Sequence, residues 1–151
     1  MKNLATILAV LLLASCDIAV ETETDTEIEW LDAPGTEGMN LPFSSAVRVD
    51  NLLFLSGALG IVPGTGEMAE GGIQGETRQT LENISRTLEN FGSSMDRVVK
   101  CTVFLADVAE WGAMNEVYAT FFPNKPARSA LGANGLAFGA RTEIECIAVV
   151  N

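Results

Sequence analysis

Histidine is absent from this chain of 151 residues, and cationic side chains are scarce. Without histidine, neither a Ser-His-Asp triad nor a Cys-His pair can form, and no cysteine–histidine spacing offers a zinc site. Lys and Arg number 9 against 20 Asp and Glu, a formal net charge of −11. Because nucleic-acid binding depends on cationic side chains, such an acidic chain is not expected to bind nucleic acid. The glycine-rich region 57–72 matches neither a P-loop nor a dinucleotide fingerprint, so no cofactor or metal is expected.

A hydrophobic run long enough to span a bilayer is also lacking. The apolar run 4–14 follows Lys2 and has the length of a signal-peptide core rather than that of a transmembrane helix. It leads into Leu-Ala-Ser-Cys at 13–16, which resembles a bacterial lipobox. We therefore expect 1–15 to be a lipoprotein signal peptide and Cys16 to be lipidated; the alternative is an ordinary secretory signal with a cysteine there by chance.

An acidic segment follows the signal. Residues 16–29 carry six acids and no Lys or Arg, which is typical of a solvated, self-repelling tether. The remaining residues, 30–151, are enough for one domain with its own core. The predicted protein is thus exported and lipid-anchored at a membrane, on the periplasmic face in a Gram-negative bacterium, with the lipid as its membrane contact.

Two further cysteines, Cys101 and Cys146, lie inside apolar, strand-like runs. Export would permit a disulfide between them. Sequence spacing cannot establish the geometry that a disulfide needs, so two small buried thiols are the favoured interpretation. Neither cysteine has the basic surroundings that activate a nucleophilic thiol.

The hydrophobic pattern predicts strands and two helices in the order β-β-β-α-β-α-β-β. Amphipathic spacing marks the helices, and alternating or continuous apolar runs mark the strands. The expected strands are 27–31, 44–49, 52–57, 98–105, 127–133 and 141–150, and the expected helices are 73–91 and 109–122. Three strands before the first helix favour an α+β fold, a mixed sheet with both helices packed on one face. The other face is too apolar for water and is expected to meet other subunits.

The segment Lys-Pro-Ala-Arg-Ser-Ala at 125–130 and the segment Thr-Glu-Ile-Glu at 142–145 carry the candidate chemistry. The guanidinium of Arg128 can bind a carboxylate through two parallel hydrogen bonds. The carboxylate of Glu143 can hold a water or move a proton, which matters in a chain without histidine. Arg128 could instead pair an acidic neighbour, and Glu143 could be an ordinary solvated strand residue.

Several segments together, in the same order, resemble the RidA (YjgF/YER057c/UK114) family. The resemblance covers about 28–150. Its motifs are Ala-Val-Arg-Val at 46–49, Asn-Leu-Leu-Phe-Leu-Ser-Gly at 51–57, Thr-Arg-Gln-Thr-Leu-Glu-Asn at 77–83, Val-Lys-Cys-Thr-Val-Phe-Leu at 99–105, Met-Asn-Glu-Val-Tyr at 114–118, Pro-Ala-Arg-Ser at 126–129 and Glu-Ile-Glu at 143–145. The resemblance implies a chorismate-mutase-like fold, assembled as a homotrimer with three clefts between subunits.

The resemblance also implies an activity, the hydrolysis of 2-imino or enamine acids to 2-keto acids and ammonia without a cofactor. Arg128 would clamp the substrate carboxylate, and Glu143 would orient or activate the attacking water. The partner would be a small imino or keto acid. A non-catalytic carboxylate-binding or chaperone-like trimer is the main alternative, and ribonuclease activity is the weakest.

Four further residues are carried over as substrate-binding positions: Phe43, Gly57, Asn115 and Ala130. Backbone groups near Gly57 and Ala130 would line the pocket, and Asn115 would support it. Phe43 stands where the enzymatic branch often has a tyrosine, and Ala130 stands where a Cys or Val is frequent. Both departures predict a more apolar pocket wall and leave the substrate open.

Overall fold

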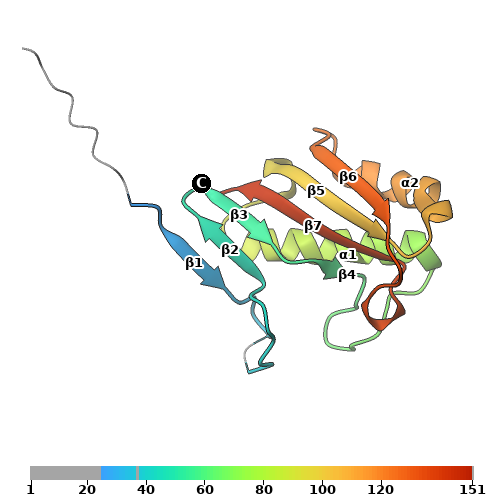
Figure 1. The fold of residues 1–151 in the computed structure, drawn as a ribbon, viewed down its shortest axis with the longest axis horizontal. Helices are drawn as coiled ribbons and strands as arrows, with labels where there is room; N and C mark the ends of the chain where they lie inside the picture. The colour runs from blue at the N-terminus through green and yellow to red at the C-terminus, as the bar shows by residue number, and fades with distance from the viewer. Residues whose placement is uncertain (1–24, 37, 151) are drawn as a thin grey trace, which may run out of the picture.

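The computed structural model describes residues 25–36 and 38–150. The predictions for the signal peptide, for Cys16 and for most of the acidic tether therefore lie outside the described residues. The strands are β1 (Ile28–Leu31), β2 (Ala46–Val49), β3 (Leu52–Leu55), β4 (Ala58–Leu59), β5 (Val98–Leu105), β6 (Ala127–Gly132) and β7 (Thr142–Val149), and the helices are α1 (Gly72–Asn90) and α2 (Trp111–Phe121) (Figure 1). The described residues also contain three short 3₁₀ turns, η1 (Met95–Arg97), η2 (Val108–Glu110) and η3 (Ala137–Gly139).

All seven strands form one mixed sheet in the order β1-β2-β3-β7-β5-β6, with β4 also paired to β7. β5 and β6 run parallel, because α2 connects them, and the other pairs are antiparallel. Asp50 has a φ of 52° in the turn between β2 and β3, a conformation that aspartate tolerates in a tight hairpin. The predicted α+β fold is confirmed; the two-residue strand β4 was not predicted.

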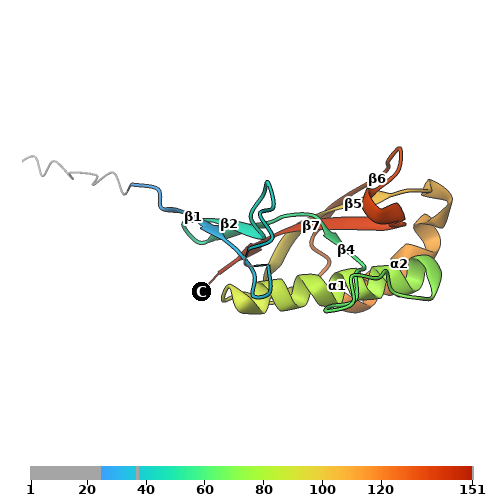
Figure 2. The ribbon, with the colours of Figure 1, turned by 90° about the horizontal axis from the view of Figure 1, so that it is seen from below.

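Both helices cover the same face of the sheet, as predicted, and the other face is uncovered in the single chain (Figure 2). α1 buries one stripe of side chains at helical spacing against the sheet: Ile73, Thr77, Thr80, Leu81, Ile84 and Leu88. Gly92, with a φ of 79°, allows the chain to leave the helix, and the Ser93 N–H donates to the Leu88 carbonyl at 2.8 Å. Each fully buried leucine in this layer stabilises the fold by about 1.5–3 kcal/mol.

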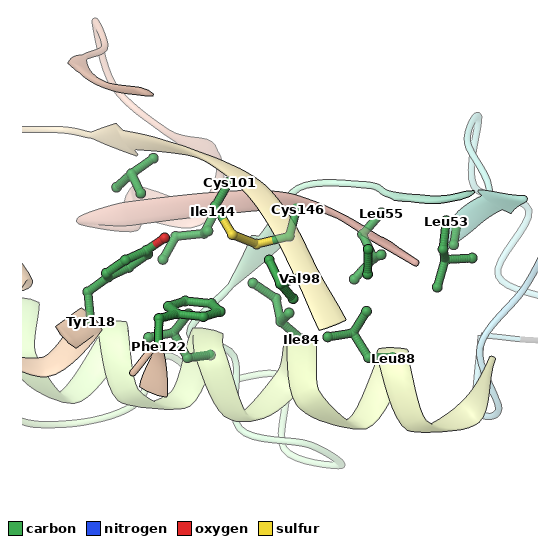
Figure 3. Packing of buried hydrophobic residues seen from close by; sticks show 14 of the residues in the cluster. Leu53, Leu55, Ile84, Leu88, Val98, Cys101, Tyr118, Phe122, Ile144 and Cys146 are labelled. Carbon is green, nitrogen blue, oxygen red and sulfur yellow. A yellow bond between two sulfur atoms is a disulfide. The ribbon is translucent and has the colours of Figure 1, made fainter. Parts of the chain in front are cut away.

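Cys101 and Cys146 form a disulfide, and the prediction of two free thiols is wrong (Figure 3). Cys101 lies directly opposite Cys146 in the antiparallel pair β5–β7, with the Cα atoms 4.1 Å apart. Both side chains point to the helix-covered face, where they are fully buried. The two residues are 45 positions apart in sequence, so only the strand register brings their sulfurs together.

The N-terminal strand overlaps the end of the predicted tether. Ile28 pairs with Val49 in β1–β2, and the carboxylate of Glu29 lies 3.1 Å from the guanidinium of Arg48. Across residues 25–36 and 38–150, no helix has both the length and the apolar character of a membrane span.

Candidate active site

Arg128 lies on β6, the edge strand of the sheet, and its side chain is directed toward α2. One of its terminal nitrogens (Nη1) donates to the side-chain oxygen of Asn115 at 2.7 Å. The guanidinium carbon lies 4.7 Å from the ring centroid of Tyr118 and 5.9 Å from that of Trp111. All three partners are on α2 and none carries a negative charge, so the helix fixes the cation in place by hydrogen bonding and cation–π attraction without neutralising it.

A hollow of about 500 Å³ opens beside this cation. We call it the arginine hollow; its lining residues are Asn115, Tyr118, Ala119, Phe122, Pro123, Lys125, Pro126 and Arg128. Its volume is in the range of small-molecule sites. Its walls are mostly apolar, and its charged groups are Arg128 and Lys125. The structure thus brings two predicted site residues, Arg128 and Asn115, together at a hollow that suits an anion.

Glu143 and Gly57 form a second group, which we call the glutamate patch. Glu143 lies on β7 between β4 and β5, where Leu59 and Phe104 are its register partners. Its carboxylate lies directly over Gly57, and a β-carbon on Gly57 would collide with it. A side chain at Gly57 would therefore displace the carboxylate, which explains why glycine suits this position.

Within one chain, the arginine hollow and the glutamate patch lie on opposite faces of the sheet. Arg128 is in register with Cys101 and Cys146, whose side chains point to the helices. Glu143 is three residues from Cys146 on the same strand, so its side chain points to the uncovered face. Two strand spacings across the sheet and three residues along it put the Cα atoms of Arg128 and Glu143 about 14 Å apart. A single chain does not bring these two groups together.

The remaining two predicted residues, Phe43 and Ala130, do not line the arginine hollow. Phe43 is 56% exposed and is next to Ser44, whose carbonyl accepts a hydrogen bond from the Ser56 hydroxyl at 2.7 Å. This bond ties the residue after Phe43 to the residue before Gly57. Ala130 is two residues after Arg128 on β6 and packs partly buried against the core, outside the lining of the arginine hollow.

Tyr118 and Lys125 belong to the arginine hollow but were not among the predicted site residues. Tyr118 follows Asn115 by three positions, so helical periodicity places both on one face of α2; the spacing alone suggested a core residue. Its hydroxyl is buried and has no hydrogen-bond partner in the described part of the chain. Burial raises the pKa of Tyr118, and the positive charge of Arg128 offsets part of that rise.

The described residues contain no group of three or more His, Cys, Asp or Glu side chains that could hold a metal ion. The chemistry that the site can supply comes from a fixed guanidinium, an ammonium, a carboxylate and apolar walls. This combination suits a small organic anion that is reactive enough to be attacked by water without a strong acid or base.

Comparison with known proteins agrees with this reading of the fold. The family model described as Endoribonuclease L-PSP matches residues 34–150. The chain is 37% identical over 138 residues to the chloroplastic Reactive Intermediate Deaminase A of Arabidopsis thaliana, covering 91% of this chain and 72% of that protein. It is 42% identical over 109 residues to the 2-iminobutanoate/2-iminopropanoate deaminase of Mus musculus, covering 72% and 81%.

Solved structures give the same result. The crystal structure of YEO7 from yeast superposes with a TM-score of 0.76 at 36% identity, covering 83% of this chain and all of that one. The family match over residues 34–150 includes both helices and both candidate groups. The chain belongs to the RidA/YjgF family.

Proposed function

We propose that this chain hydrolyses reactive 2-imino acids to 2-keto acids and ammonia. The observation that carries the proposal is Arg128, a guanidinium fixed by neutral partners at the mouth of a hollow. The names of the mouse and Arabidopsis relatives, which describe deaminases, support it. In a chain with so few cations, an arginine without a carboxylate partner at a hollow suits an anionic ligand.

The proposed reaction needs little machinery. Arg128 holds the substrate carboxylate and so fixes the adjacent imine carbon. Glu143 accepts a proton from a water as the water oxygen bonds to that carbon, and it passes this proton to the imine nitrogen to give a carbinolamine. The carbinolamine hydroxyl then gives its proton, through Glu143, to the nitrogen; the C–N bond breaks, ammonia leaves with the electron pair, and the C=O bond of the 2-keto acid forms. The imine is already electrophilic, so positioning supplies most of the effect.

The proposed site forms between copies of the chain, in a homotrimer with three clefts. Each chain would present its arginine hollow to the glutamate patch of a neighbour. Two observations support this: Arg128 and Glu143 face opposite sides of one sheet, and the uncovered face carries exposed apolar side chains. On that face Phe54 is 39% exposed and Leu131 is 44% exposed. Contact with water disfavours such apolar side chains, so their burial against another subunit would be favourable.

The direct test uses 2-iminopropanoate generated in the cuvette by an amino-acid oxidase, with semicarbazide trapping the imine that has not been hydrolysed. We expect added protein to speed the release of pyruvate and ammonia in equal amounts. The variant Glu143→Gln tests the role of the carboxylate. Glu145→Gln is its matched control, because both glutamates lie on the uncovered face of β7. Wild-type protein that leaves the spontaneous rate unchanged would rule out catalysis.

The second candidate is a non-catalytic trimer that binds small carboxylates. Export from the cytoplasm, which we propose below, would favour it, because the best-known imines of this family arise on cytoplasmic enzymes that use pyridoxal phosphate. The same assay separates the two functions: binding of 2-oxobutanoate without any acceleration of imine hydrolysis supports the binder.

We also propose that the protein is exported and anchored by a lipid on Cys16. The disulfide between Cys101 and Cys146 supports this proposal independently of the lipobox, since such bonds persist mainly in oxidising compartments. Replacing Cys16 by Ser is expected to abolish palmitate labelling and release the protein from membranes. Continued membrane association of Cys16→Ser would contradict the anchor.

A further inference from the structure

Lys125 is a second cation in the arginine hollow, three residues before Arg128. In the described ranges, no carboxylate pairs with either side chain, and none lines the hollow. The rest of the lining is the Asn115 amide, the Tyr118 ring and four apolar residues. The hollow therefore has two positive charges and no internal counter-charge, in a protein whose net charge is −11.

The backbone at Lys125 holds this cation in an unusual conformation. Its φ is 52°, in the left-handed region that glycine and asparagine occupy more easily than lysine. A turn fixes it there: the Lys125 N–H donates to the Phe122 carbonyl at 3.1 Å, and prolines stand at 123 and 126. A lysine in this position costs backbone energy, and such strain is frequent at ligand clamps.

The hollow is also larger than a three-carbon acid requires. At about 500 Å³ it leaves room beyond a carboxylate held on Arg128. Lys125 is exposed in the single chain, so water partly screens an ion pair formed with it and its contribution is modest. A second carboxylate on the substrate would have Lys125 as its partner.

We propose that Lys125 is a specificity-determining residue and that the site prefers 2-imino acids with a second, distal carboxylate. The proposal rests on the proposed function: the α-carboxylate binds Arg128 and the distal carboxylate binds Lys125. The corresponding products are 2-keto dicarboxylates. Lys125 takes no part in the chemical step, so its contribution is to affinity and selectivity.

The experiment compares two keto acids of equal chain length. 2-Oxoglutarate ends in a second carboxylate, and 2-oxopentanoate ends in a methyl group. Binding to the full-length protein is measured by titration calorimetry at low ionic strength. We expect 2-oxoglutarate to bind about fivefold more tightly, the scale of a partly exposed ion pair. Added salt is expected to reduce this preference.

Three variants sharpen the test. Lys125→Asn removes the charge while keeping a residue that tolerates the left-handed turn, so it is expected to erase the preference and leave 2-oxopentanoate affinity unchanged. Lys125→Arg is expected to restore the preference. Lys100→Gln is the control, because Lys100 lies away from the hollow and donates to the Ser129 hydroxyl at 3.0 Å.

The outcomes separate the two proposals. Equal binding of both keto acids by the wild type, or a preference that survives in Lys125→Asn, overturns the role of Lys125 and leaves the proposed function standing. Failure of the wild type to bind either keto acid overturns the substrate site as a whole. A preference that is lost in Lys125→Asn and kept in Lys100→Gln establishes the second carboxylate contact.

Discussion

The arginine hollow and the glutamate patch differ in how far one chain completes them. In the hollow, α2 supplies a hydrogen bond, an aromatic face and apolar walls, so the cation is fixed before any partner arrives. In the patch, the carboxylate lies over a glycine on an uncovered sheet face. Within one chain the surroundings of the cation are therefore complete, whereas the proposed acid–base group depends on what covers the open face of the sheet.

The largest expected effect comes from Arg128→Ala. Loss of the carboxylate clamp is expected to lower kcat/KM for 2-iminopropanoate by about 100-fold, the scale of charge-assisted hydrogen bonds. Arg86→Ala is the matched control. Arg86 also donates to an asparagine side chain, the Asn83 oxygen at 3.0 Å, but it lies on the exposed surface of α1. Equal activity of the two variants would show that Arg128 is not the clamp.

Mixing two inactive variants tests whether the two regions meet between chains. Arg128→Ala and Glu143→Gln, unfolded and refolded together, are expected to regain activity at about one site in four, because random assembly restores some intact clefts. Each variant refolded alone should stay inactive. Absence of any recovery, with mixed oligomers demonstrated by mass spectrometry, would mean that the two groups do not act at one site.

The disulfide joins β7, which carries Glu143, to β5, the neighbour of the strand that carries Arg128. Adding reductant during denaturant unfolding is expected to lower the free energy of unfolding by about 2–4 kcal/mol, because the bond closes a long loop in the unfolded chain. The double variant Cys101→Ala/Cys146→Ala should be insensitive to reductant. Identical unfolding of the wild type with and without reductant would show that the bond is absent.

Gly57→Ala probes the glutamate patch without altering either charge. The added methyl group displaces the flexible end of Glu143, so we expect kcat to fall about tenfold while stability changes by less than about 0.5 kcal/mol. The measurements are steady-state kinetics and chemical denaturation. A normal kcat in Gly57→Ala would show that the position of the Glu143 carboxylate does not matter.

The smallest effect concerns Tyr118, the single tyrosine of the chain. Because burial raises its pKa above 10.0, the unfolded chain loses this proton first as pH rises, and stability is expected to fall from about pH 10 upward. Below that pH the phenol is neutral in both states and adds no slope. Tyr118→Phe should remove this alkaline component and cost little at neutral pH, since the hydroxyl has no partner to lose.

The absorbance of tyrosinate measures the ionisation of Tyr118 directly. It should titrate above 10.0 in the folded protein and higher still in Arg128→Gln, where the nearby positive charge is gone. Titration at or below 10.0 would contradict the buried position of the ring beside Arg128.

Much of the fold could be predicted because the periodicities were strong. The spacing of apolar residues on α1 and the β-rich run of β5 identified both elements to within two residues. β4 was missed because two residues are too few to show alternation; they form a strand only because β7 lies alongside. Of the site, Arg128 and Asn115 were predicted from the family motifs, whereas Tyr118 and Lys125 lie within the quoted segments but were not named as site residues.

Local periodicity and composition were enough to predict the longer elements, their order, the acidic surface and the residue types that can do chemistry. Strand register, in contrast, followed only from the folded sheet. Register joined Cys101 to Cys146 across 45 positions, and it sent Arg128 and Glu143 to opposite faces of the sheet. Shifting a strand by one residue reverses every side chain on it, and no local pattern specifies which residue of a distant strand will be its neighbour.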